Sequence, residues 1–172
     1  DDRTSRGLGD VYKRQDRNIN LICLYLPNGN PAPGPKYDYK INWMKRLIKY
    51  TEDIYDKNEP LILGGDFNVI QEDIDCYDIS KWHDDALYLK KTRRHMKELI
   101  NIGLIDSYRL KYPNLKEYSF WDYQAGAWQK DNGIRIDFFL ISPEIVDILS
   151  DVGIDRIPRG QDLSLIHISE PT

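Results

Sequence analysis

Apolar and polar residues alternate in blocks along the chain, and the spacing within each block predicts its secondary structure. A nearly continuous apolar run from Ile19 to Leu26 predicts a buried strand, and the proline- and glycine-rich residues 27–35 predict a loop. Between Tyr37 and Asp56 the apolar residues recur at helical spacing, which predicts an amphipathic helix. A second short buried strand is predicted from Pro60 to Gly65.

The rest of the chain continues this alternation. A shorter helix is predicted over Thr92–Ile102, with Thr92 as its N-terminal cap and Gly103 as its end. Two further strands are predicted over Tyr118–Tyr123 and Ile134–Ile141. Because strands alternate with helices, the sequence predicts an α/β fold built in layers.

The two ends of the chain predict a boundary between genuine protein and foreign sequence. One back-translation of Leu163–Thr172 has a reverse complement that encodes Arg6–Gln15, so both ends can come from opposite strands of one DNA segment. That segment resembles an adapter used in sequencing libraries. We therefore expect Asp1–Gln15 and Leu163–Thr172 to be adapter read-through, and Asp16–Asp162 to be one partial domain.

Composition narrows the class of protein. The formal net charge is −4, which is unlike a passive nucleic-acid coat but compatible with a carboxylate-rich site that a cation neutralises. No apolar run approaches the roughly 20 residues that cross a bilayer, so no membrane partner is expected. Cys23 and Cys76 lack metal-type spacing, and we expect both to be reduced, structural residues of a cytosolic protein.

The clearest candidate for chemistry follows the second predicted strand, in Gly-Gly-Asp-Phe-Asn. Side chains two positions apart in extended backbone point the same way, so Asp66 and Asn68 can converge on one ligand. The preceding glycines allow a sharp turn and a close approach to that ligand. The structural alternative is an ordinary strand end with an Asx turn, which we weigh equally for this motif alone.

A second candidate is Asp137, which interrupts the apolar stretch Ile134–Ile141. A carboxylate in such a strand is costly unless it is paired. A functional partner would be a histidine held in one orientation, whereas a structural partner would be Arg135 or backbone amides. We expect His83 and His95 to be surface residues.

Two weaker motifs surround these. Tyr25 ends the first strand in Tyr-Leu-Pro-Asn and could donate to a phosphate oxygen, although a core role is more common for such a tyrosine. The aromatic stretch from Tyr118 to Trp128 suits stacking on bases or lining a pocket, although aromatic residues in a strand are more often core.

Taken in order, these motifs resemble exodeoxyribonuclease III and related abasic-site endonucleases of the endonuclease/exonuclease/phosphatase superfamily. Gly-Leu-Ile-Asp-Ser-Tyr-Arg at Gly103–Arg109 and the Phe-Trp-Asp-Tyr stretch add to the likeness. The resemblance implies a DNase I-like four-layer α/β sandwich, of which this chain holds the C-terminal part. It also implies a monomeric bacterial cytoplasmic enzyme of base excision repair, which cleaves double-stranded DNA at abasic sites or 3′ ends with Mg²⁺ or Mn²⁺.

The resemblance also implies roles for individual residues. Asp66 would activate the attacking water or protonate the leaving group, Asn68 and Tyr25 would hold the phosphate, and Asp137 would orient a histidine. Asp66 and Asn68 would also form a possible second metal site. The implied DNA contacts, including a pocket for a baseless sugar, are Asn28, Phe120, Trp121, Asn132, Ile134 and Ile136.

The chain departs from the family's pattern in two places. The family's metal-binding glutamate and an active-site asparagine would lie upstream, and its Ser-Asp-His motif would follow shortly after Gly160. His167 belongs to the adapter-like end and is not that histidine. We therefore expect this chain to be inactive and to expose an apolar sheet face. The alternatives are a phosphodiesterase that acts on RNA or phospholipid, a non-catalytic DNA-binding relative, and an α/β domain whose polar residues are structural.

Overall fold

A mixed four-stranded sheet forms the centre of the molecule. The computed structural model describes residues 19–55, 59–122 and 126–156. The strand order is β1-β2-β6-β3, with β1 parallel to β2 and β6 antiparallel to both of its neighbours. These strands are β1 (Asn20–Tyr25), β2 (Leu61–Asp66), β3 (Ile105–Asp106) and β6 (Asp137–Ile141). A separate two-stranded ribbon pairs β4 (Phe120–Trp121) with β5 (Gly133–Ile134).

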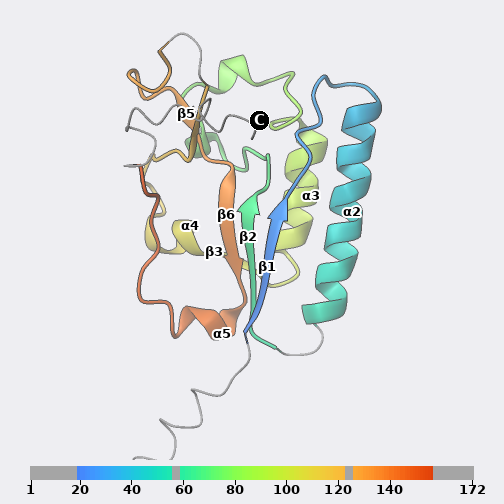
Figure 1. Cartoon of the computed structure of the whole chain (residues 1–172), viewed down its shortest axis with the longest axis vertical. Coiled ribbons are helices and arrows are strands. Elements are labelled where there is room, and N and C mark those ends of the chain that lie inside the picture. The colour runs from blue at the N-terminus through green and yellow to red at the C-terminus, as the bar shows by residue number, and fades with distance from the viewer. Residues whose placement is uncertain (1–18, 56–58, 123–125, 157–172) are drawn as a thin grey trace, which may run out of the picture.

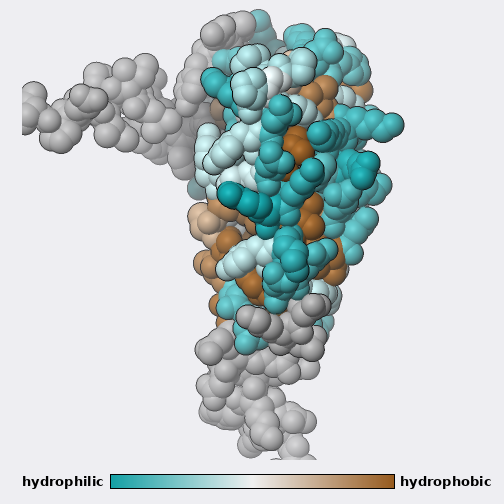
Figure 2. Space-filling view, turned by 90° about the vertical axis from the view of Figure 1, so that its right-hand side faces the viewer, coloured by the Kyte–Doolittle hydropathy of each residue, from teal (hydrophilic) through white to brown (hydrophobic). Residues whose placement is uncertain are grey.

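Two long helices cover one face of this sheet (Figure 1). They are α2 (Pro35–Tyr55) and α3 (Lys90–Ile100), and they lie side by side. The outward side of this layer is mostly hydrophilic, with small apolar patches (Figure 2). The remaining helices are short: α4 (Ser107–Lys111), α5 (Pro143–Val146), and the 3-10 turns η1 (Asp73–Asp75) and η2 (Ile79–Lys81). A mixed sheet with a helical layer confirms the predicted α/β class.

The main core lies between the sheet and these two helices. Every second residue of the strands points toward α2 and α3, and these side chains pack against the apolar side of the two helices. The contributing strand residues include Leu24, Leu61, Leu63, Phe138 and Leu140, and the helical ones include Ile41, Met44, Leu47, Met96 and Leu99.

The opposite face of the sheet is partly exposed and carries apolar residues. Leu21 and Phe139 have exposed fractions of 67% and 52%, and Cys23 between them in the sheet is also exposed. Soluble monomers rarely expose contiguous apolar surface of this kind, so this face is a surface prone to association. The expected exposure of an apolar sheet face is therefore present among the described residues.

Several element boundaries differ from the prediction. Helix α3 begins at Lys90 with Leu89 at the N-cap position, so the assignment of Thr92 as a cap is wrong. Thr92 is buried, and its hydroxyl donates to the carbonyl oxygen of Ala86 at 2.7 Å. His95 is also buried, with an exposed fraction of 6%, so the prediction of a surface residue is wrong for it and right for His83.

The two predicted C-terminal strands are shorter than expected. Ile134–Ile141 divides into β5 and β6, because the backbone leaves the ribbon and joins the central sheet between them. Of Tyr118–Tyr123, only Phe120 and Trp121 are extended in a ladder, and Tyr123 lies outside the described residues. The two adapter-like ends, 1–15 and 163–172, also lie outside them.

Two further findings concern membranes and thiols. In the three described ranges, no helix combines the length and the apolar character that a membrane crossing requires. Cys23 and Cys76 are both free thiols, the first exposed and the second buried.

Candidate active site

Strand register places three of the predicted site residues in one row. Tyr25 pairs with Asp66 across β1 and β2, and Asp66 pairs with Asp137 across β2 and β6. Neighbouring strands lie about 4.8 Å apart, so the three side chains line up across the sheet. They share the face that points away from α2 and α3: Tyr25 has an exposed fraction of 69%, Asp137 is exposed, and Asp66 is half-buried. The structure therefore brings together residues that are far apart in the sequence.

Asp66 and Asn68 are joined by a tight turn. Asn68 has a φ of 48°, and its backbone N–H donates to Asp66 Oδ1 at 2.7 Å. The expectation that both residues lie in extended backbone is therefore wrong, and the Asx-type contact of the alternative interpretation is present. The turn still keeps the two residues at one site, because it anchors one to the carboxylate of the other.

The Asn68 side chain connects the ends of β1 and β2. Its Nδ2 donates to the carbonyl oxygen of Leu26 at 2.8 Å, and its Oδ1 accepts from Asn28 Nδ2 at 3.3 Å. A backbone bond of 2.8 Å from Leu26 to Asp66 lies alongside. Asn68 has an exposed fraction of only 4%, so its amide orientation is determined by these protein contacts.

Lys40 is a site neighbour that the sequence analysis did not identify. It has an exposed fraction of 0%, and its Nζ donates to the carbonyl oxygens of Asn28 and Asn68. Burial lowers the pKa of Lys40 to about 7, although Asp85 and Asp66 favour its charged form. One signal was available in the sequence: Lys40 lies at helical spacing between Tyr37 and Met44, on the buried stripe of α2.

The Asp66 carboxyl titrates closer to neutrality than an ordinary aspartate. Its pKa is raised to about 6: burial is the largest cause, the Asn68 N–H opposes the shift, and the nearby Asp137 carboxylate adds to it. A carboxyl with such a pKa can exchange a proton near neutral pH, which suits acid–base chemistry.

The candidate site also offers carboxylate oxygens to a cation. Two neighbouring carboxylates favour a hard divalent cation, for which oxygen is the preferred ligand atom. Among residues 19–55, 59–122 and 126–156, however, no group of three or more acidic, cysteine or histidine side chains is arranged to hold a metal ion. The described residues therefore hold no complete metal site, and Asp66 is the carboxylate of the Asp66–Asn68 pair that was expected to contribute to one.

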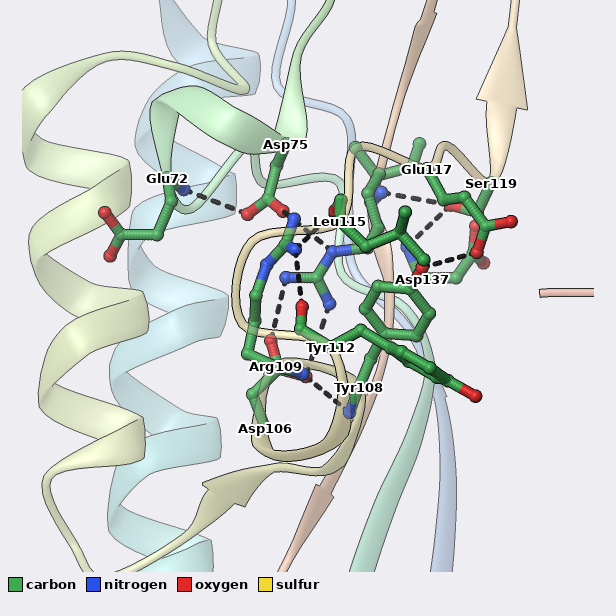
Figure 3. A network of polar contacts seen from close by, with 12 residues as sticks. Glu72, Asp75, Asp106, Tyr108, Arg109, Tyr112, Leu115, Glu117, Ser119 and Asp137 are labelled. Carbon is green, nitrogen blue, oxygen red and sulfur yellow. Dashed lines mark hydrogen bonds and ion pairs between the residues drawn. The ribbon is translucent and has the colours of Figure 1, made fainter. Parts of the chain in front are cut away.

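Ser119 fixes the backbone that carries Asp137. Its Oγ accepts from the backbone N–H of Ile136 at 3.1 Å and of Asp137 at 3.2 Å (Figure 3). These bonds form where the chain passes from β5 to β6, and they aim the first residue of β6. A cavity of about 220 Å³ lies beside Asp137, and Ser119, Phe138 and Phe139 are among the residues that line it.

A buried ionic network lies behind this segment. Arg135 Nε donates to Asp75 Oδ1 at 2.8 Å, and its Nη2 donates to Asp106 Oδ2 at 2.8 Å. Arg109 contacts the same oxygen of Asp75, so the network joins three distant segments (Figure 3). The structural alternative that paired Arg135 with Asp137 is therefore wrong: Arg135 faces the interior, whereas Asp137 is exposed.

The residues expected to contact DNA differ in accessibility. Phe120 and Asn132 are half-buried and Asn28 is exposed. Ile134 and Ile136 have exposed fractions of 1% and 4% in a second apolar cluster, with Phe120 packed against it.

Trp121 lies in a third apolar cluster. Its exposed fraction is 3%, its ring contacts Trp128 with 4.6 Å between centroids, and its Nε1 donates to Asp131 at 3.1 Å. Trp121 therefore supports the ribbon from within.

The fold and the row of polar residues define an α/β domain with an acidic site at the end of its central sheet. The model of the endonuclease/exonuclease/phosphatase family matches residues 3–164, so the chain belongs to that family. It is 30% identical over 155 residues to an exodeoxyribonuclease of Bacillus subtilis (strain 168), covering 90% of this chain and 61% of that protein. It is also 30% identical to the DNA repair nuclease APEX1 of Danio rerio, covering 90% of this chain and 49% of that protein.

Solved structures show the same fold. A 3′ phosphatase, NExo from Neisseria, bound to a product DNA hairpin, superposes with a TM-score of 0.81 at 33% identity, over 84% of this chain and 56% of that one. An AP endonuclease from Archaeoglobus fulgidus gives a TM-score of 0.78 at 32% identity, over 82% and 55%. The chain therefore spans about half to three fifths of the length of these relatives.

Proposed function

We propose that the complete protein is a metal-dependent nuclease of base excision repair, of the exodeoxyribonuclease III type. It would act as a 3′–5′ exodeoxyribonuclease and an abasic-site endonuclease. The observation that carries this proposal is the row of Tyr25, Asp66 and Asp137, in which the pKa of Asp66 is raised to about 6. The names of the relatives from Bacillus subtilis and Danio rerio, and of the two solved structures, support the choice of substrate.

Each residue of the row has a chemical task in this proposal. Asp66 takes a proton from the attacking water or returns one to the leaving oxygen, which its raised pKa supports. Tyr25 and Asn68 donate to the phosphate as negative charge develops on it. Asp137 orients a histidine from outside the described residues.

A divalent cation, Mg²⁺ or Mn²⁺, belongs to the same proposal. When bound, such an ion stabilises negative charge on the phosphate and lowers the pKa of coordinated water. The carboxylate of Asp66 and the amide oxygen of Asn68 would form a possible second site for this ion. A glutamate from outside the described residues would supply the main ligand.

We further propose that double-stranded DNA with abasic sites or 3′ ends is the substrate, and that the enzyme acts as a monomer in a bacterial cytoplasm. Asn28 is exposed and Phe120 and Asn132 are half-buried, which favours these three as direct contacts. Ile134, Ile136 and Trp121 would instead support them from beneath. Because the histidine and glutamate come from elsewhere, we propose that the 172-residue chain alone is inactive.

A hybrid enzyme tests the function. The chain would replace the matching part of the Bacillus subtilis exodeoxyribonuclease, and cleavage of abasic duplex DNA, RNA and phospholipid would be measured with Mg²⁺ and with Mn²⁺. We expect abasic DNA to be cleaved by the hybrid, and not by its Asp66→Asn variant. Preference for RNA or lipid would favour another phosphodiesterase, and a folded hybrid that binds abasic DNA without cleaving it would favour a non-catalytic relative.

A further inference from the structure

Lys40 places a buried amino group between the two loops that form the candidate site. It belongs to α2, outside all the motifs that suggested the site, and has an exposed fraction of 0%. Its Nζ donates to the carbonyl oxygen of Asn28 at 2.9 Å and to that of Asn68 at 2.6 Å. A single side chain thus holds the backbone of both loops.

These two contacts join segments that are 40 positions apart in the sequence. Asn28 follows β1 and Asn68 follows β2, and their side chains meet at 3.3 Å between Nδ2 and Oδ1. If the loops separated, the Asn68 side chain would lose the donor that orients its oxygen. Lys40 therefore acts on the same pair of residues from the backbone side.

The surroundings of Lys40 are shaped around its long side chain. A Cβ atom at Gly29, which has a φ of 89°, would lie 2.6 Å from Lys40 Cδ, so a glycine makes room for the lysine. On the far side, Asn30 Nδ2 donates to Asp85 Oδ2 at 3.0 Å and Asn30 Oδ1 accepts from Ala86 N–H at 3.0 Å. These bonds attach the segment of Asp85 and Ala86 to the loop that follows β1.

Packing alone does not account for a lysine at this position. Neighbouring residues of the same stripe, Ile41 and Met44, are apolar, and a methionine would fill a similar volume without the cost of burying an ammonium group. The ion pairs of the described residues do not include Lys40, so backbone carbonyls are its closest recorded acceptors. Its specific contribution is the alignment of two carbonyl groups.

We propose that Lys40 is a positioning residue, which holds the Asn28 and Asn68 loops together so that the Asn68 side-chain amide faces the reacting phosphate. The positioning itself stands on the contacts of Lys40, whereas its value for catalysis rests on the proposed nuclease function. Lys40 does not touch the substrate in this proposal, and it acts through Asn28 and Asn68.

The test compares Lys40→Met with Met44→Ala in the full chain. Both change buried residues of α2, and Met44 belongs to the core beneath the sheet. Hydrogen exchange of the asparagine side-chain amides would be measured by NMR, with exposed Asn101 as the internal reference. We expect Lys40→Met to accelerate exchange at Asn68 at least about tenfold and to shift its signals, because the loops separate.

Met44→Ala is expected to lower the melting temperature without moving the Asn28 and Asn68 signals. The proposal is overturned if Lys40→Met leaves those signals as in the parent chain, or if Met44→Ala moves them equally. Should Lys40→Met fail to fold, Lys40→Gln is judged by the same two outcomes, because glutamine is shorter and reaches at most one carbonyl. This readout needs no turnover, so an inactive hybrid enzyme would overturn the nuclease proposal alone.

Discussion

Replacing Arg135 by methionine tests the buried ionic network behind the site. The Arg135 side chain has an exposed fraction of 1% and its partner Asp75 of 0%, so the variant leaves a buried carboxylate without one of its cations. Removal of one member of a buried ion pair costs about 3–5 kcal/mol of unfolding free energy, because the desolvated charge that remains is poorly compensated.

The remaining contacts place the expected cost at the lower end of that range. Asp75 still contacts Arg109, and its Oδ2 still accepts from the Glu72 N–H at 3.0 Å. Asp106 keeps its role at the start of α4, where it accepts from two backbone N–H groups. We therefore expect Arg135→Met to cost about 3 kcal/mol. A chain of this size loses about 2–4 °C per kcal/mol, so the melting temperature should fall by about 6–12 °C.

Urea and thermal unfolding, followed by circular dichroism, measure this cost. Arg94→Met is the matched control, because its ion pair with Glu98 is exposed and contributes about 0.5 kcal/mol or less. The double variant Asp75→Asn with Arg135→Met should lose less unfolding free energy than the two single variants added together, since each single variant already removes the same Arg135–Asp75 ion pair. A loss for Arg135→Met no larger than for Arg94→Met would refute the view that the buried network holds these segments.

Three further predictions concern the sheet. Gly65→Ala should lower the unfolding free energy measured in urea by at least about 2 kcal/mol, because Gly65 has a φ of 135° and an added Cβ would overlap the Leu24 carbonyl oxygen. A loss below about 1 kcal/mol would contradict this. In metal-free buffer, Asp66→Asn should stabilise the chain above pH 6. The folded-state pKa of Asp66, about 6, exceeds the ordinary 3.8, so ionisation of Asp66 removes stability as the pH rises from about 4 to above 6. Equal melting temperatures of the variant and the parent chain at pH 8 would show this to be wrong. Phe139→Ser should reduce self-association in sedimentation velocity, whereas Tyr50→Ser on the exposed side of α2 should not; equal effects would locate association elsewhere.

Local spacing was enough to predict most of the elements. The observed bounds of β1, α2 and β2 lie within one or two residues of the predicted ones. Each strand is a short apolar run, and the apolar residues of α2 keep helical spacing throughout. The prediction of one continuous strand was wrong for Ile134–Ile141. The apolar stretch Ile134–Ile141 continues across the step from the ribbon to the central sheet, and apolar character alone carries no sign of that step.

Burial was predicted less well than secondary structure. Asp137 and Arg135 lie two positions apart in an apolar stretch, and the apolar pattern predicted the aspartate as the buried charge. The structure places the arginine inside, because Asp75 and Asp106 reach it from distant segments. Lys40 was overlooked for a similar reason, since the carbonyl oxygens that accept hydrogen bonds from it belong to the loops that follow β1 and β2, far from α2 in the sequence.

The sequence by itself determined the α/β class, the order of the motifs and the presence of acidic residues at two strand ends, because these follow from local periodicity and residue type. Only the tertiary structure decided that Tyr25, Asp66 and Asp137 form one row, since the register between strands depends on hydrogen bonds between distant segments. It also decided which charges are buried, because burial depends on what packs against a residue from elsewhere in the chain. The candidate site is therefore encoded in local motifs, and its geometry is set by long-range pairing.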